Sequence, residues 1–150
     1  MRFRKLSNVE LEALSEELIQ FLVVQGIDDE LWRKINKESP QKAEELVSLF
    51  SDTVLQKVYS KVGFLYFVSE QIFSIFKIEG EDMEAIVIKN KSKTESFQNL
   101  KSVMTRITKD KNDYEVLHAK RALGDKILDE IHNLSEKGCL VAEEELWQYF

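Results

Sequence analysis

Residues 64–88 interrupt an otherwise helical pattern of hydrophobicity with the composition of paired β-strands. Aromatic side chains crowd the first part of the segment, and residues 72–78 and 83–88 are rich in β-branched side chains. Between these two runs lies Glu79-Gly80-Glu81-Asp82, a polar stretch with a glycine that is typical of a turn. The segment therefore predicts a small antiparallel sheet of about three strands around residues 64–89.

The sequence on either side of the predicted sheet indicates helices. Ser7 and Glu10 match a capping box, in which the two side chains bind free backbone N–H groups at a helix start. Ser39-Pro40 marks another start, because serine is a good N-cap and proline loses only a donor that is already free. A further helix is predicted after Asn112 or Asp113. Its apolar residues at helical spacing are Leu117, Leu123, Ile127, Ile131 and Leu134. The fold class is thus α+β, with a helical N-terminal half, the small sheet, and C-terminal helices that pack back on it.

The composition favours a single globular domain over residues 1–150. A chain of 150 residues, of which 43% are hydrophobic and 32% charged, is long enough to bury a core and has the make-up of a soluble protein. No apolar run approaches the roughly 18 residues that a membrane-spanning helix needs. Cys139 is the one cysteine, so no intramolecular disulfide forms. Without an export signal, we expect a cytoplasmic protein.

A repeated acid-x-x-His pattern is the sharpest candidate for chemistry. Glu115 and His118, and again Asp129 and His132, are three residues apart. On a helix such pairs share a face, as the metal ligands of carboxylate-bridged di-iron bundles do. The two copies lie about 21 Å apart along one helix, so only an antiparallel dimer would bring them to one metal. The alternative is two histidines on a charged, solvated face. We predict no catalytic residue and no cofactor.

The segment Lys89–Lys111 is basic although the net charge of the chain is −6. It holds seven basic residues and two acidic ones. Lys101, Arg106 and Lys109 are the candidates for contacts with nucleic-acid phosphates. Phe97 is the one aromatic residue there, which is poor for stacking on bases, and lysines on a helix exterior are usually a solvated face. An RNA- or DNA-associated protein is therefore the alternative function.

Aromatic residues in the predicted sheet and at the C-terminus are candidates for partner binding. Apolar residues alternate onto both faces of the predicted strands, so both faces are covered, either by helices of the same chain or by another protein. The segment 139–150 is too apolar for a free tail and should dock as a strand-like turn and a short helix. The partner-binding candidates are Tyr66, Phe73, Trp147, Tyr149 and Phe150.

Three stretches resemble an uncharacterised family of small bacterial proteins, a domain of unknown function. They are Met1-Arg2-Phe3-Arg4-Lys5-Leu6-Ser7, Leu49-Phe50-Ser51-Asp52, and Glu136-Lys137-Gly138-Cys139-Leu140 followed by Glu145-Leu146. The resemblance implies a bacterial cytoplasmic protein and supplies no activity, cofactor or catalytic residue. The leading functional hypothesis is a non-enzymatic interaction or adaptor protein that binds a protein partner or forms a homodimer, away from any membrane. A metal-dependent enzyme is the third hypothesis.

Overall fold

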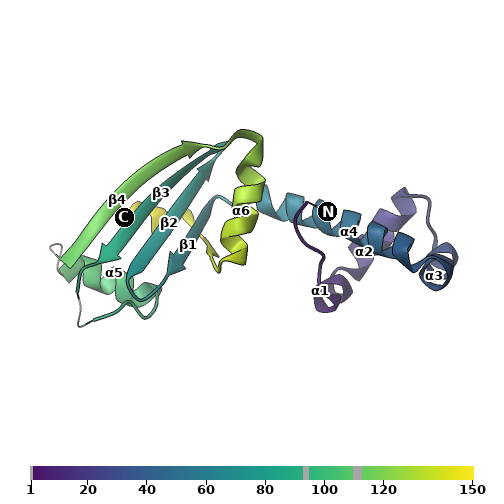
Figure 1. Cartoon of the computed structure of the whole chain (residues 1–150), viewed down its shortest axis with the longest axis horizontal. Helices are drawn as coiled ribbons and strands as arrows, with labels where there is room; N and C mark the ends of the chain where they lie inside the picture. Colours follow the sequence, from purple (N-terminus) through teal and green to yellow (C-terminus); the bar gives the residue numbers. More distant parts are fainter. Residues whose placement is uncertain (1, 93–94, 110–112) are drawn as a thin grey trace. The chain divides into compact units, whose positions relative to one another are not determined.

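The computed structural model describes residues 2–92, 95–109 and 113–150 (Figure 1). The chain divides into two compact units, Met1–Val58 and Tyr59–Phe150, and each is described here by itself. That the chain makes a single domain stays a prediction. Within the described residues no helix is both long enough and apolar enough to cross a membrane.

The first unit is helical, as predicted. Its helices are α1 (Asn8–Ala13), α2 (Ser15–Val24), α3 (Asp29–Glu38) and α4 (Pro40–Tyr59), the last of which ends at the start of the second unit. The predicted capping box at Ser7 and Glu10 is present, and α4 begins at Pro40. The small core of this unit is a cluster of apolar side chains from α2 to α4. Its buried members are Leu22, Ile27, Ile35 and Ala43.

The second unit is built on an antiparallel sheet. The described strands are β1 (Phe64–Val68), β2 (Ile72–Glu79), β3 (Asp82–Asn90), β4 (Tyr114–Ala122) and β5 (Leu140–Ala142). Their order across the sheet is β4-β3-β2-β1-β5. The predicted hairpin is confirmed, with Glu79 paired to Asp82 and Gly80 at a φ of +61° between them. The fold is α+β as predicted, but the sheet has five strands rather than about three.

The predicted helix after residue 112 is wrong in its first half. Tyr114–Ala122 forms β4, and the helix α6 (Ile127–Glu136) begins only after a short 3₁₀ turn at Gly124–Lys126. Asn112, one of the two predicted caps, lies outside the described residues. The physical reason is tertiary: all nine residues of β4 pair with β3, and this ladder outweighs the helical preference of leucine, alanine, lysine and arginine.

One side of the sheet carries the main core of the second unit. Side chains of β1, β2 and β3 on this side pack against Phe97, α5 (Leu100–Lys109) and α7 (Glu144–Tyr149). The segment after Gly138 forms β5 and α7, so the predicted docking of the C-terminus as a strand and a short helix is confirmed. The buried centre of this core is Phe73, Ile75, Ile86, Ile88, Phe97 and Val103.

Candidate functional site

The opposite side of the sheet is largely uncovered by the helices of the second unit. α5 and α7 lie behind the strands in Figure 1, while the middle of the facing side carries no helix in the described residues. The strand registers place four rows of residues on this side, and one of them runs from Phe67 through Ser74 and Val87 to Leu117. We call this surface the open face. It consists of Phe67, Ile72, Ser74, Phe76, Ala85, Val87, Leu117 and Ala119.

The open face combines apolar side chains with solvent exposure. Ile72 is 37% exposed and Leu117 is 42% exposed, and Phe67, Phe76 and Val87 are half-buried. Small residues, Ser74 and Ala85, lie between the larger side chains. Scattered single apolar residues are normal on a protein surface, but a contiguous apolar face indicates an interaction site.

The helix α6 covers the open side of the sheet only at one end. Arg121, which is paired with Met83 across the sheet, donates a hydrogen bond from Nη2 to Glu130 Oε1 of α6 at 3.3 Å. At the other end of α6, Gly138 has a φ of +106°, and a Cβ atom there would lie 3.4 Å from the ring of Phe67. Glycine is therefore needed where α6 turns back onto the sheet.

The predicted partner-binding aromatics lie on the covered side. Phe73 is completely buried, and its ring centroid lies 4.8 Å from that of Phe150. Tyr66, Trp147 and Phe150 are half-buried against the same core. Tyr149 is exposed, and its hydroxyl donates to the Met104 carbonyl at 3.0 Å. These residues hold α5 and α7 to the sheet, and Phe73 has no surface to offer a partner.

The nucleic-acid candidates on α5 differ in their exposure to solvent. Lys101 and Lys109 are exposed. Arg106 lies against the ring of Phe97, 5.4 Å from its centroid, and its Nε is 3.3 Å from Glu95 Oε2. Its guanidinium is thus engaged within the chain. Of the predicted basic stretch, Lys93 and Lys111 lie outside the described residues.

The two acid-x-x-His pairs are not on one helix. Glu115 and His118 lie on β4, where residues three apart point to opposite sides of the sheet. His118 Nε2 is instead 2.7 Å from Glu84 Oε1 on β3. Asp129 and His132 lie on α6, and His132 Nδ1 is 2.9 Å from the Tyr59 hydroxyl. No three His, Cys, Asp or Glu side chains converge as a metal site within the described residues.

Cys139 has the surroundings of a structural thiol. It is half-buried directly after the glycine that ends α6, and its N–H donates to the Leu134 carbonyl at 3.0 Å. Burial raises the pKa of the Cys139 thiol, which lowers the fraction of reactive thiolate. The neighbouring charge of Lys137 opposes this effect but is the smaller one.

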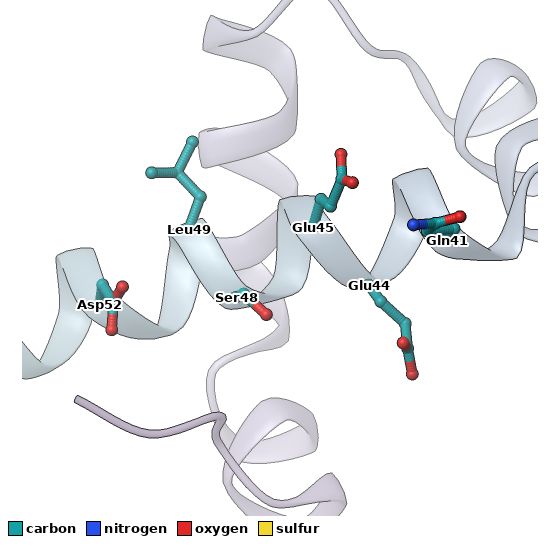
Figure 2. Close-up of a pocket in the computed structure, with 6 residues that line it drawn as sticks. All are labelled: Gln41, Glu44, Glu45, Ser48, Leu49 and Asp52. Carbon is teal, nitrogen blue, oxygen red and sulfur yellow. The ribbon is translucent and has the colours of Figure 1, made fainter. Parts of the chain in front are cut away.

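A hollow along α4 serves to attach the N-terminal segment. Figure 2 shows its lining residues, Gln41, Glu44, Glu45, Ser48, Leu49 and Asp52. The Asp52 carboxylate accepts the N–H groups of Arg2 and Phe3 at 2.6 and 2.9 Å, and Lys5 Nζ lies 3.3 Å from Glu44 Oε1. Two of the acidic side chains in this hollow are therefore already bound by the chain itself.

The first two of the three stretches that carry the family resemblance meet here. Ser51, fully buried, accepts the N–H of Leu6 at 3.0 Å and donates to the Val47 carbonyl at 2.7 Å. Arg4 forms two hydrogen bonds with the Glu10 carboxylate, and these, with the backbone N–H of Ser7, lower the pKa of Glu10 to about 2. The motifs are structural: they fasten the chain before α1 to α4.

The fold and the sheet define an α+β protein with a partly exposed sheet face. The chain belongs to a family of unknown function, DUF6495, whose model matches residues 1–150. The predicted membership of an uncharacterised family is confirmed. No similar protein was found among curated proteins, and none among solved structures.

The sequence did not single out the open face. Its central residues, Val87 and Leu117, belong to strands β3 and β4, and β4 was predicted to be helical. The alternation of apolar residues in β2 and β3 signals two apolar sides, but it does not tell which side the helices of the chain cover.

Proposed function

We propose that this protein is a non-enzymatic interaction protein of the cytoplasm and that its open face binds a partner protein. The observation that carries the proposal is a row across four strands in which Val87 is only half-buried and Leu117 is exposed, with no described helix of the same unit over its middle. A sheet side of this kind gains free energy when another element covers it, at about 25 cal/mol per Å² of apolar surface removed from water.

The partner that best fits the open face is an amphipathic helix. The face is apolar along its middle, with Ser74 and Ala85 leaving room for the larger side chains of a helix laid across the strands. Its far end carries an exposed lysine and glutamate, Lys89 and Glu115, which lie opposite each other on β3 and β4. An apolar stripe on one face of a helix matches this middle, and polar residues beside the stripe match the charged end.

Photo-crosslinking from defined positions tests the proposal. A photoreactive phenylalanine analogue is introduced at Ile72, on the open face, or at Leu140, which is 58% exposed but lies on the other side of the sheet. We expect one discrete adduct in cells of the native host from Ile72 and none from Leu140. The substitution Val87→Lys should abolish the Ile72 adduct while far-UV circular dichroism stays unchanged.

Two outcomes contradict the proposal. One is that the adducts from Ile72 and Leu140 are the same. The other is that the Ile72 adduct survives Val87→Lys in a folded protein. Either result means that the open face does not select a partner.

Nucleic-acid binding has less support. Lys101 and Lys109 are exposed on α5, but the third predicted contact, Arg106, is held by Glu95 and Phe97. Retention on a polyanion column that falls steeply with salt is the expected sign of phosphate contacts, and a triple Lys101→Ala, Arg106→Ala, Lys109→Ala variant would reduce it. The metal-dependent enzyme is supported least, because its proposed ligands lie on separate elements.

A further inference from the structure

The outer edge of β4 is a long, open sheet edge. β4 has nine residues and pairs with β3 alone, and it runs along the upper border of the sheet in Figure 1. All of its side chains after Tyr114 are exposed. The other edge strand, β5, has only three residues. Short edge strands resist further pairing, whereas long ones are templates for another strand. Of the two edges, β4 is the one that is able to accept a strand.

The backbone of β4 offers alternate residues to this edge. At the two ends of the ladder, Lys91 N donates to Asp113 O at 2.8 Å and Leu123 N donates to Glu81 O at 2.9 Å. Antiparallel ladders alternate with a period of two, so the odd-numbered residues of β4 bond to β3. The N–H and C=O groups of Val116, His118 and Lys120 therefore point outward, and no backbone partner for them is found in the described parts of the chain.

We infer that two copies of this chain pair through β4, antiparallel and centred on His118. A two-fold axis that sets two antiparallel strands side by side must stand perpendicular to the sheet, so paired residues come from the same side of both copies. His118 is the middle residue of Tyr114–Ala122, so with this centre the two copies of β4 pair along their whole length. The resulting pairs are Tyr114 with Ala122, Glu115 with Arg121, Val116 with Lys120, and Leu117 with Ala119, each occurring twice.

The charges of β4 favour this register. Glu115 of one copy lies opposite Arg121 of the other, and this pair occurs twice per dimer. Both residues are at positions that do not exchange backbone hydrogen bonds between the copies, where facing side chains are closest. Arg121 uses one nitrogen for Glu130, and a guanidinium has further donors. A centre at Ala119 places no opposite charges directly across within the strand. A centre at Leu117 sets Arg121 against Asp113, just before the strand, and overlaps only residues 114–120 of β4. Charged side chains on an edge normally prevent pairing, but here they select one partner, the same strand.

The pairing has a consequence for the open face. Because the axis is perpendicular to the sheet, the open faces of both copies lie on the same side and meet along β4. The inference concerns the backbone edge of β4, whose Leu117 and Ala119 also border the open face, whereas Ile72 and Val87, which test the proposed function, lie on β2 and β3.

Sedimentation of three proteins tests the edge pairing. Val116→Pro removes an outward N–H without touching the ladder to β3, and Val116→Ala keeps that N–H while shortening the same side chain. We expect wild type and Val116→Ala to form dimers at high micromolar concentration and Val116→Pro to be monomeric. Glu115→Arg should weaken the dimer about tenfold or more, and Glu115→Arg with Arg121→Glu should restore it. A monomeric wild type, or a dimer that persists in both Val116→Pro and Glu115→Arg, overturns the inference.

Cysteine pairing tests the register itself, in a Cys139→Ser background. Mixing a Leu117→Cys chain with an Ala119→Cys chain should yield a disulfide-linked dimer under mild oxidation, and neither variant should yield one alone. Linkage of Leu117→Cys to itself at equal yield refutes the register centred on His118. Failure of these experiments leaves the Ile72 crosslink unaffected, and loss of that crosslink leaves the dimer unaffected, so the two proposals are tested separately.

Discussion

Removing the Ser51 hydroxyl should destabilise the first unit by leaving one buried N–H without an acceptor. Ser51 is fully buried and Leu6 is 4% exposed, and the Leu6 N–H to Ser51 Oγ bond of 3.0 Å is the buried one among the contacts that join their segments. An orphaned buried N–H costs about 1–3 kcal/mol. Alanine is a better helix former than serine by roughly 0.5 kcal/mol, which offsets part of this cost. We therefore expect Ser51→Ala to lower the free energy of unfolding by about 1–2 kcal/mol.

Thr53→Ala is the matched control. Thr53 Oγ1 donates to the carbonyl four residues earlier at 2.8 Å, as Ser51 Oγ does at 2.7 Å, but Thr53 is exposed. Both substitutions lose this local bond, and only Ser51→Ala also loses the tie to Leu6. We expect Thr53→Ala to change the free energy of unfolding by no more than about 0.5 kcal/mol.

Urea unfolding followed by tryptophan fluorescence measures this effect in the full chain. Trp32 packs on the core of the first unit and Trp147 on that of the second, so a Trp147→Phe background reports the first unit alone. Amide exchange of Leu6, measured in parallel, should be faster in Ser51→Ala. The reasoning is refuted if Ser51→Ala and Thr53→Ala cost the same, or if the exchange of the Leu6 amide does not change.

Three further predictions concern core packing, backbone conformation and pH. Phe73→Ala should lower the free energy of unfolding by about 3–5 kcal/mol, because Phe73 is fully buried. Phe76→Ala should lower it distinctly less, because Phe76 is only half-buried on the open face. Equal losses in urea melts would contradict this assignment of the two residues to opposite sides of the sheet. Gly138→Ala should lower the free energy of unfolding by more than about 1 kcal/mol, since the φ of Gly138 is +106°. Gly63→Ala is the control: no atom lies near the added Cβ, so its stability in thermal melts should stay within about 1 kcal/mol of wild type. Glu10, with its pKa lowered from 4.5 to about 2, should contribute stability that is complete above pH 4.5 and is lost as the pH falls through 2. Because its side chain is 38% exposed, we expect about 1 kcal/mol or less, seen as a difference from Glu10→Gln at pH 6 that disappears near pH 2.

Local signals in the sequence determined much of the fold. The capping box at Ser7 and the start of α4 at Pro40 depend on residues a few positions apart, and both are present in the structure. The hairpin of β2 and β3 follows from two β-branched runs around Gly80. The C-terminal strand and short helix follow from apolar residues too numerous for a free tail. For the helix starts and the hairpin the interactions are local, so the sequence pattern is enough to predict them.

Contacts between distant residues decided the rest. Residues 114–122 have apolar residues at spacings that suit a helix, yet they form a strand because β3, some thirty residues earlier in the chain, presents a free ladder edge. That change moves Glu115 and His118 to opposite sides of a sheet and removes the helical metal geometry. It also creates the edge at which we place the dimer.

The open face has the same origin. Alternation along β2 places Phe73 and Phe76 on opposite sides of the sheet. Only the packing of α5 and α7 on one side buries Phe73 in the core and leaves Phe76 half-buried. The sequence by itself determined which segments are helices or strands where local hydrogen bonding and turn chemistry suffice. Only the tertiary structure decided which sheet side is covered and which edge is open, because helix-to-sheet packing and strand pairing depend on residues far apart in the chain.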